Sequence, residues 1–212
     1  MPSKTADRET GHSAVDAEMM QRCIGLSEAA VKRGELPFGA LICGGGEVIA
    51  EAANEVVRST DVTQHAEIVA MSAAQRRLGR TDLSGYALYS TVEPCAMCSY
   101  AIRETRIDRV VFAIRSPMMG GLSKWNVLRD TQLSRAMPEI FGPVPEVIAG
   151  LSQREAEKIW RAWNPLMWAI IKHRGYLGGQ AASAGCEHLQ AIPQRLSLVR
   201  RLLMRRRKNS SA

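Results

Sequence analysis

Two short, separated motifs constrain the fold of this chain more than any other feature of its sequence. One is His-Ala-Glu at positions 65–67, and the other is Pro-Cys-Ala-Met-Cys at positions 94–98. Zinc binds imidazole nitrogen and thiolate sulfur readily and prefers four tetrahedral partners. If folding brings the motifs together, His65, Cys95 and Cys98 supply three ligands and leave the fourth position for water, which is the arrangement of a catalytic zinc site. Glu67 would then lie where it can move the protons of that water.

The surrounding residues place each motif at the start of a helix. Apolar residues recur at helical spacing from Ile68 to Leu78, directly after His65. Pro94 follows the strand-like run 86–91 and precedes a second helical segment, near whose first turn a proline is well tolerated. Unpaired backbone N–H groups at a helix start favour anions and lower the pKa of cysteine. Both sulfurs are therefore expected to bind as thiolates at neutral pH.

Strand and helix signals elsewhere in the chain indicate one α/β domain. Further strands are expected at 40–42 and 48–50, joined by the glycines at 44–46, and at 109–114 and 144–149. Prolines at 143 and 145 should keep the last strand short or at an edge. A first helix is expected at 19–32, and a helical region at 152–171 should break near Asn164 because Pro165 follows it.

Two other interpretations of the motifs remain open at this point. The histidine and the cysteines could be ordinary helix-start and core residues. A closed structural zinc site is also conceivable, but it needs a fourth protein ligand, which Cys23, Cys43, His173 or Cys186 would have to supply. The chain contains no second Cys-x-x-Cys and no His-x-x-x-His pattern. An open site with three protein ligands is therefore the favoured hypothesis.

The two motifs together form the signature of zinc deaminases that act on nucleobases. Over residues 18–170 the chain resembles the cytidine deaminase superfamily, in the branch of tRNA adenosine deaminases, guanine deaminases and cytosine deaminases. The resemblance extends to the stretches 37–40, 91–98 and 106–112 and to Asn54. It implies a three-layer α/β/α fold around a five-stranded mixed sheet.

The same resemblance implies Zn²⁺ as cofactor and hydrolytic deamination with release of ammonia. Glu67 would take a proton from water and pass protons to the ring nitrogen and to the leaving amine. Family members commonly hold the ring with an asparagine that precedes the His-x-Glu helix and with a backbone N–H beside the histidine. Asn54 and Ala66 match these positions. The other interpretation of Asn54 is a turn residue that closes the second strand.

The residues that would select the substrate give a divided answer. Phe38 is more typical of free-base and guanine deaminases than of the tRNA enzymes, whereas the segment 116–121 departs from both patterns. Trp125 and Asn126 are the nearest candidates for contacts to the ring. We therefore expect a small aminated heterocycle as substrate, such as a nucleobase, a nucleoside or a triazine analogue. A tRNA adenosine deaminase is the first alternative, and a catalytically silent zinc-fold binding protein is the second.

The distribution of charge gives an independent argument about partners. The chain has 28 basic and 21 acidic residues, but seven of the basic residues follow Glu187, the last acid. Residues 1–187 are therefore formally neutral, so the chain is not expected to present a strongly basic face to nucleic acid, although binding remains possible. We expect a disordered segment at 1–15, the deaminase domain at 16–175, and a linker with a basic tail at 176–212.

Composition adds expectations about location and assembly. No apolar run approaches the roughly 20 residues that a transmembrane helix needs, and no signal peptide is recognisable. The five cysteines are an odd number, and two are assigned to metal, which indicates a reducing cytoplasm. The resemblance implies a homodimer. Trp160, Trp163 and Trp168 are expected in packing positions, with closure of one of them over the substrate as the alternative.

Overall fold

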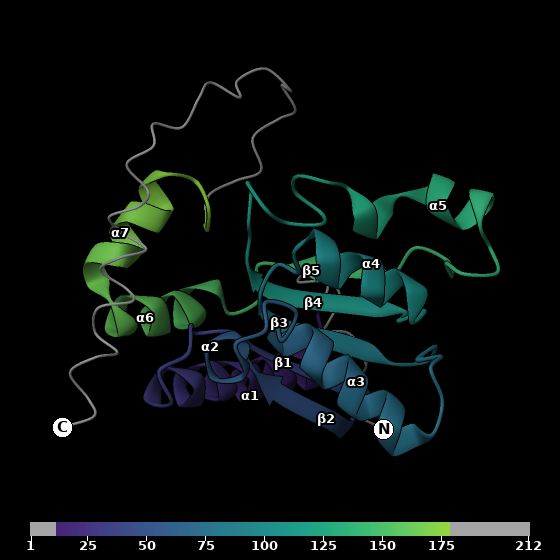
Figure 1. The fold of residues 1–212 in the computed structure, drawn as a ribbon, viewed down its shortest axis with the longest axis horizontal. Coiled ribbons are helices and arrows are strands. Elements are labelled where there is room, and N and C mark those ends of the chain that lie inside the picture. Colours follow the sequence, from purple (N-terminus) through teal and green to yellow (C-terminus); the bar gives the residue numbers. More distant parts are fainter. Residues whose placement is uncertain (1–11, 179–212) are drawn as a thin grey trace, which may run out of the picture. The chain divides into compact units, whose positions relative to one another are not determined.

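The computed structural model describes residues 12–178, and residues 1–11 and 179–212 lie outside its described part. Its centre is a five-stranded mixed sheet in the order β2-β1-β3-β4-β5 (Figure 1). The middle strand β3 pairs antiparallel with β1 and parallel with β4, and the two edge strands pair antiparallel (β2) and parallel (β5) with their neighbours. The strands are β1 (Gly39–Gly44), β2 (Glu47–Ala53), β3 (Ala87–Val92), β4 (Arg109–Ile114) and β5 (Glu146–Ala149).

Helices cover both faces of this sheet and complete the three layers that the resemblance implied (Figure 1). Helices α1 and α6 pack on one face and α3 packs on the other, with α4 beside it. The helices are α1 (Ala14–Lys32), α2 (Val56–Ser59), α3 (Ala66–Leu78), α4 (Ala96–Glu104), the 3₁₀ helix η1 (Val127–Arg129), α5 (Thr131–Ala136), α6 (Gln153–Trp163) and α7 (Pro165–His173). The predicted fold class is therefore confirmed. Within residues 12–178, none of the helices combines the length and the apolar character needed to cross a bilayer.

The apolar residues of the central strands alternate between two cores, as the two-residue period of a strand requires. Leu41, Tyr89 and Val111 pack under α1 and α6. Ile42 and Leu88 belong to the core under α3 and α4. Because both faces are buried, the central strands read as nearly continuous apolar runs in the sequence.

The described domain is longer at both ends than predicted. Helix α1 begins at Ala14, five residues before the predicted start and inside the segment expected to be disordered. A capping box between Ser13 and Asp16 stabilises this first turn, and it was overlooked in the sequence. At the other end Leu177 is buried, and the N–H of Gly178 donates to Arg115 O at 2.9 Å, so the domain continues past residue 175. The expected linker beyond Gly178 and the basic tail lie outside the described residues.

The C-terminal helices follow the prediction closely. Asn164 separates α6 from α7, and its side-chain oxygen accepts from the N–H of Met167 at 3.0 Å, so it caps the second helix. Trp160 and Trp168 are buried, and Trp163 is half-buried. The ring centroid of Trp160 lies 6.0 Å from that of Trp168 and 5.7 Å from that of Trp163. The expected packing role of the three tryptophans is thus confirmed. Strand β5, as the prolines predicted, is short and lies at an edge.

Candidate metal centre and active site

The starts of α3 and α4 meet beyond the carboxyl end of β3. His65 is the N-cap residue of α3, and Cys95 is the N-cap residue of α4. Cys98 lies in the first turn of α4 and is fully buried. Because the chain runs from β3 through Pro94 directly into α4, the strand fixes the position of both cysteines. The prediction that each motif opens a helix is confirmed.

The spacing of the three ligand atoms fits a zinc ion. His65 Nδ1 lies 3.6 Å from Cys95 Sγ and 3.5 Å from Cys98 Sγ, and the two sulfurs are 3.6 Å apart. Tetrahedral zinc with bonds of about 2.3 Å to sulfur and about 2.0 Å to nitrogen separates its ligand atoms by roughly 3.5–3.8 Å. When bound, zinc would supply a water activated for attack at neutral pH. These residues therefore fit the cofactor that the resemblance implied.

A fourth protein ligand is absent from this group in the part of the chain that the structure describes. His65, Cys95 and Cys98 are the only set of metal-ligand side chains brought together among residues 12–178. The thiol of Cys23 donates instead to Tyr89 O at 3.5 Å, and Cys43 is buried on β1, so neither joins the group. His173 also lies outside it, and Cys186 is not among the described residues. The closed structural site is thus not supported by the described residues.

The ligand group prepares one of its two thiolates, since the hydrogen bond with Cys95 and burial raise the pKa of the Cys98 thiol well above its ordinary value. In the metal-free protein, the hydrogen bond with Cys98, supported by one with His65, lowers the pKa of the Cys95 thiol to about 4. Cys95 is therefore a thiolate at neutral pH before metal arrives. Zinc binding requires thiolate sulfur and neutral imidazole, so it has to displace the remaining protons of the group.

Glu67 lies next to the ligand group but does not belong to it. Its Oε2 is 3.7 Å from Cys98 Sγ, and its Oε1 accepts a hydrogen bond from Ser90 Oγ at 3.1 Å. Only 5% of its surface is exposed, and this burial raises the pKa of its carboxyl above the ordinary value. A carboxyl group whose pKa is shifted toward neutrality can both accept and return a proton. Ser90, on β3, was missed in the sequence because nothing in its local pattern distinguishes it from other strand residues.

Two of the predicted ring-binding residues occupy defined positions. Asn54 is buried directly after β2, and its Nδ2 donates to Glu35 Oε2 at 3.0 Å. Glu35 is buried and also accepts from the N–H groups of Val57 and Arg58, so it fixes the orientation of the amide. Ala66 is the first residue of α3 and fully buried, where a helix leaves its N–H without an intrahelical partner. Both positions suit groups that hold a ring, and their role in binding stays a prediction.

Of the other three predicted substrate residues, only Phe38 contacts a residue just described, because its carbonyl accepts from the N–H of Asn54 at 3.1 Å. Phe38 packs against the core, edge-on to Trp160 with ring centroids 5.2 Å apart. Trp125 is 57% exposed, and Lys124 Nζ lies 6.0 Å from its ring centroid. Asn126 is exposed and has a left-handed backbone at the start of η1. Among residues 12–178, no hydrogen bond or ring contact joins these three to His65, Glu67 or the cysteines, so their contact with substrate remains a prediction.

Comparison with known proteins agrees with the geometry. Residues 13–114 match the family model of the cytidine and deoxycytidylate deaminase zinc-binding region. The chain is 40% identical over 133 residues to the tRNA-specific adenosine deaminase of Aquifex aeolicus (strain VF5), covering 61% of this chain and 88% of that enzyme. It is also similar to the solved structure of a tRNA deaminase of A-to-I editing at the wobble position, with a TM-score of 0.61, 31% identity and coverage of 67% of this chain and 98% of that chain. The guanine deaminase of Nitrosomonas europaea gives a TM-score of 0.57 at 26% identity, covering 70% and 84% of the two chains.

The fold and an open zinc site that faces a carboxylate define a hydrolytic, zinc-dependent deaminase. The chain belongs to the cytidine deaminase superfamily. It is therefore an enzyme, and the alternative of a catalytically silent binding protein is not supported by these relatives. In the reaction, a C–O bond to the oxygen of water forms at the ring carbon, and the C–N bond to the amino group breaks. In its predicted role, Glu67 takes the two protons of water in succession and passes the first to the ring nitrogen and the second to the departing amine, which leaves as ammonia.

Proposed function

We propose that this deaminase acts on adenosine within RNA of the tRNA type and converts it to inosine. The observation that carries the proposal is the 40% identity to a tRNA-specific adenosine deaminase over 88% of that enzyme's length. The argument from Phe38 for a free-base substrate loses weight, because the contact of its ring with Trp160 gives this residue a packing role.

The surface beside the site supports a large substrate. The connection between β4 and β5 exposes Met118, Met119 and Trp125 by 46%, 45% and 57%. The same connection contacts the metal site, since Gly120 forms a bridge with Cys95. Proteins that bind single-stranded RNA commonly stack splayed bases on exposed aromatic and apolar side chains. An exposed apolar rim is suited to an RNA loop, whereas a free base would be better served by a closed pocket.

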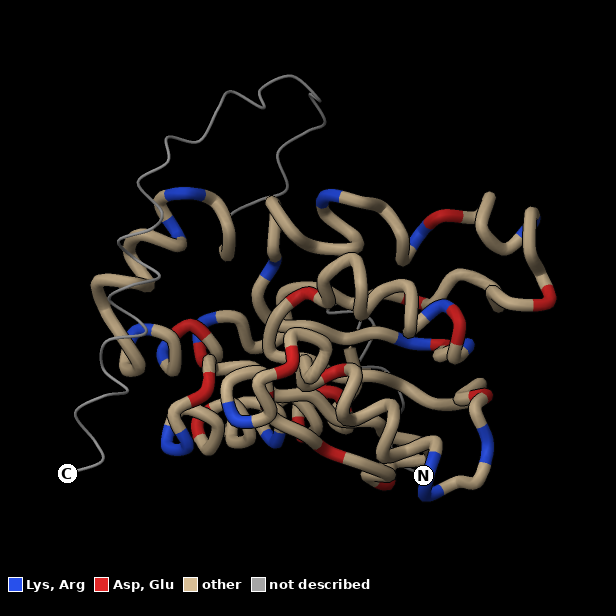
Figure 2. Tube along the Cα trace, viewed as in Figure 1, with Lys and Arg blue, Asp and Glu red and all other residues tan. Residues whose placement is uncertain are grey.

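A small aminated base or nucleoside is the second candidate. Similarity to a guanine deaminase favours it, and so does the formal neutrality of residues 1–187. Basic and acidic residues are interspersed along the described part of the chain (Figure 2). If RNA is the substrate instead, its affinity has to come from local contacts and from the basic residues after Glu187, because residues 1–187 carry no net charge.

We also propose a homodimer in the cytoplasm. Two apolar side chains of α4, Met97 and Tyr100, are exposed by 38% and 46% beside the metal ligands, and a subunit contact would cover them. The described cysteines are all free, which suits a reducing compartment. The mass of the zinc-loaded protein, measured by analytical ultracentrifugation, tests the dimer, and a monomer at micromolar concentration would contradict it.

A substrate panel separates the two candidates. The purified, zinc-loaded chain would be incubated with adenine, guanine, cytosine, their nucleosides, a triazine and tRNA transcripts, and ammonia release and inosine content would be measured. We expect inosine in a tRNA transcript and at least about a hundredfold lower kcat/KM for free adenosine, because remote contacts of the RNA contribute to orientation of the ring. Glu67→Ala is the control for contaminating activity. Fast release of ammonia from a free base, without reaction of any transcript, would favour the second candidate and contradict the first.

A further inference from the structure

Two buried charged residues flank α4, the helix that carries the cysteines. Glu93 lies just before the helix and is 3% exposed, and Arg103 lies in its last turn and is 1% exposed. Within the described residues neither forms an ion pair, because their hydrogen-bond partners are backbone and hydroxyl groups of the connection between β4 and β5. A buried charge without hydrogen-bond partners would destabilise the fold strongly, so these contacts are required.

The Glu93 carboxylate gathers both ends of one short segment, 116–123. Its Oε2 accepts from the N–H of Ser116 at 2.8 Å and from the hydroxyl of Ser123 at 2.7 Å. Its Oε1 accepts from the N–H groups of Leu122 and Ser123 at 3.0 Å and 2.6 Å. With four donors on one carboxylate, the segment is fixed to the chain two residues before the first zinc-binding cysteine.

The same segment lies directly against the metal-binding turn. The N–H of Gly121 donates to Pro94 O at 2.8 Å, and Gly120 forms an isolated bridge with Cys95. Neither glycine has room for a side chain: a Cβ on Gly120 would overlap the Glu93 carboxylate, and one on Gly121 would overlap the hydroxyl of Ser99. Close approach of backbone to backbone is therefore what the two glycines make possible.

We infer that Glu93 is a positioning residue of the active site, which holds the segment 116–123 as a fixed wall beside Cys95. The exposed Met118 and Met119 are carried by this wall, so Glu93 also fixes the surface that a substrate ring or its flanking groups meet on that side. The inference rests on the deaminase site and is independent of whether the substrate is RNA or a free base.

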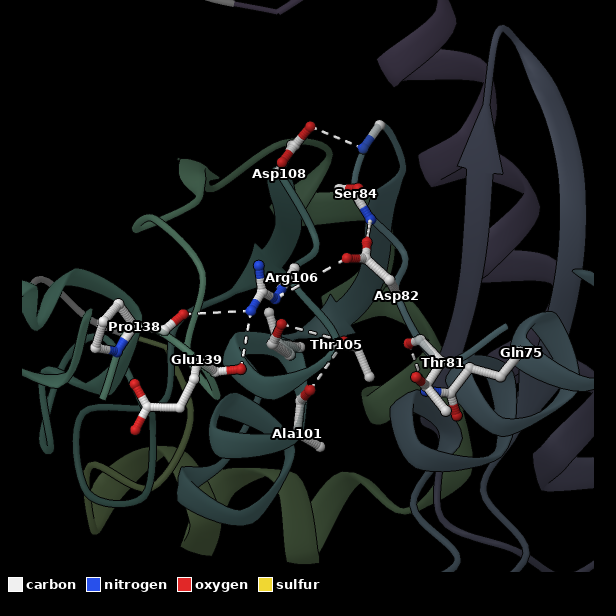
Figure 3. Close-up of polar contacts among 12 residues, drawn as sticks. Gln75, Thr81, Asp82, Ser84, Ala101, Thr105, Arg106, Asp108, Pro138 and Glu139 are labelled. Carbon is white, nitrogen blue, oxygen red and sulfur yellow. Dashed lines mark hydrogen bonds and ion pairs between the residues drawn. The ribbon is translucent and has the colours of Figure 1, made fainter. Parts of the chain in front are cut away.

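The later part of the β4–β5 connection, residues 127–142, is held by other side chains and offers an internal control. The guanidinium of Arg103 donates to the carbonyls of Val127 and Asp130 at 2.8 Å and 2.9 Å and to Gly142 O at 3.2 Å. Arg106 donates to the carbonyls of Pro138 and Glu139, and its side chain also faces Asp82 (Figure 3). These contacts lie at the end of α4 that is distant in sequence from Cys95, so loosening them should leave the wall in place.

The test compares Glu93→Gln with Arg103→Met in the zinc-loaded, full-length protein. Glutamine keeps the shape of Glu93 but turns one oxygen into an NH₂ that meets N–H donors. We expect faster backbone hydrogen exchange across 116–123 and roughly tenfold faster zinc removal by a chelator, because the ligand turn loses a neighbour. With any substrate that the wild type accepts, KM should rise about tenfold and kcat should change less than about threefold, since the wall positions the substrate and moves no proton.

Arg103→Met is the control. It should lower the melting temperature and speed exchange at 127–142, while zinc removal and KM stay near the wild-type values.

A second variant disturbs the contact between Glu93 and the segment 116–123 through a change in the segment itself. Gly120→Ala leaves Glu93 intact but fills the space that its carboxylate occupies, and it should reproduce the fast exchange and fast zinc removal of Glu93→Gln. Unchanged exchange at 116–123 in both variants would overturn the inference, and so would equal effects of Glu93→Gln and Arg103→Met on zinc removal. Hydrogen exchange and zinc removal can be measured without a substrate. A wild type that deaminates no member of the panel would therefore contradict the proposed substrate, while these two measurements would still test the role of Glu93.

Discussion

At the scale of single residues, the burial of Glu67 suits its predicted catalytic role and also carries a penalty for folding. Its burial raises the pKa of its carboxyl, which brings it closer to the working pH of a proton carrier. The same burial means that the charged form is less stable in the folded protein than in water. The hydrogen bond from Ser90 holds one of its oxygens and offsets only part of this penalty.

Glu67→Gln should therefore separate activity from stability. Turnover should fall by about 10²–10⁴-fold, because the amide cannot carry the proton, while zinc content stays the same. In the metal-free protein the variant should melt higher than the wild type at pH 7. The folded pKa lies above the ordinary value of 4.5, so the wild type bears an unfavourable buried charge above the folded pKa and none below about pH 4.5. Thermal unfolding from pH 4 to pH 8 would show the two curves converge in acid, and retained turnover would disprove the role of Glu67.

The sequence predicted those site residues whose type is dictated by the chemistry. Imidazole, paired thiols and a nearby carboxyl at fixed spacings admit few other functions, so His65, Cys95, Cys98 and Glu67 could be proposed as site residues without a structure. Glu93 belonged to a recognised stretch but had no predictable role, because its partners at 116–123 follow a whole strand later in the chain. Residues that act through contacts distant in sequence leave no local pattern.

At the scale of the elements, Asp16 connects α1 to the middle of the sheet. It is fully buried and accepts from the N–H of Ser13 at 2.6 Å, from the hydroxyl of Tyr89 at 2.7 Å and from Arg109 at 3.0 Å. Burial alone would raise the pKa of Asp16, but the hydrogen bonds from Ser13 and Tyr89, together with the charge of Arg109, lower it below the ordinary value. One carboxylate thus caps a helix and joins it to β3 and β4.

Asp16→Asn should destabilise the domain by about 1–3 kcal/mol at pH 7, because buried donors lose a charged acceptor. Since the folded pKa is depressed, the stability that the carboxylate contributes is present above the unfolded value of 3.8 and is lost as the pH falls through the folded pKa. Urea unfolding at pH 7 and at pH 3 would measure the difference. Arg22→Ala, which removes the exposed ion pair with Glu51, is the matched control and should cost less than about 1 kcal/mol. A destabilisation by Asp16→Asn no larger than that of the control would contradict the assignment.

The long elements could be predicted and the short ones could not. Apolar runs next to turn residues located all five strands, helical spacing located α3, and Pro94 and Pro165 helped to locate α4 and the break between α6 and α7. Helices α2 and α5 and the 3₁₀ helix η1 are too short for a period to be seen. Carbonyls of η1 and of Asp130 bind the buried Arg103, so tertiary contacts rather than local preference fix this region.

At the scale of the whole molecule, charge is divided unequally along the chain. The net charge of +7 is equal to that of the seven basic residues after Glu187, and residues 1–187 balance. Non-specific attraction to nucleic acid follows the number of neutralised phosphates, so in this chain it should reside in the terminal segment. The three candidate zinc ligands, in contrast, all lie within the described domain.

Deletion of residues 186–212 should therefore separate binding from chemistry. The melting temperature of the zinc-loaded domain should change by less than about 2 °C, because both hydrophobic cores and the ligand group are formed by residues 12–178. Turnover of a nucleoside, if the wild type accepts one, should stay within about twofold of the wild type, since Glu67 and the ligand group are unaffected. Affinity for a tRNA transcript should fall, and the slope of log K against log salt should decrease by up to about five, as expected when seven cations are lost. Fluorescence anisotropy at several salt concentrations would measure both quantities. An unchanged slope would show that the RNA is held by the domain alone, and a collapse of nucleoside turnover would show that the terminal segment contributes to the active site.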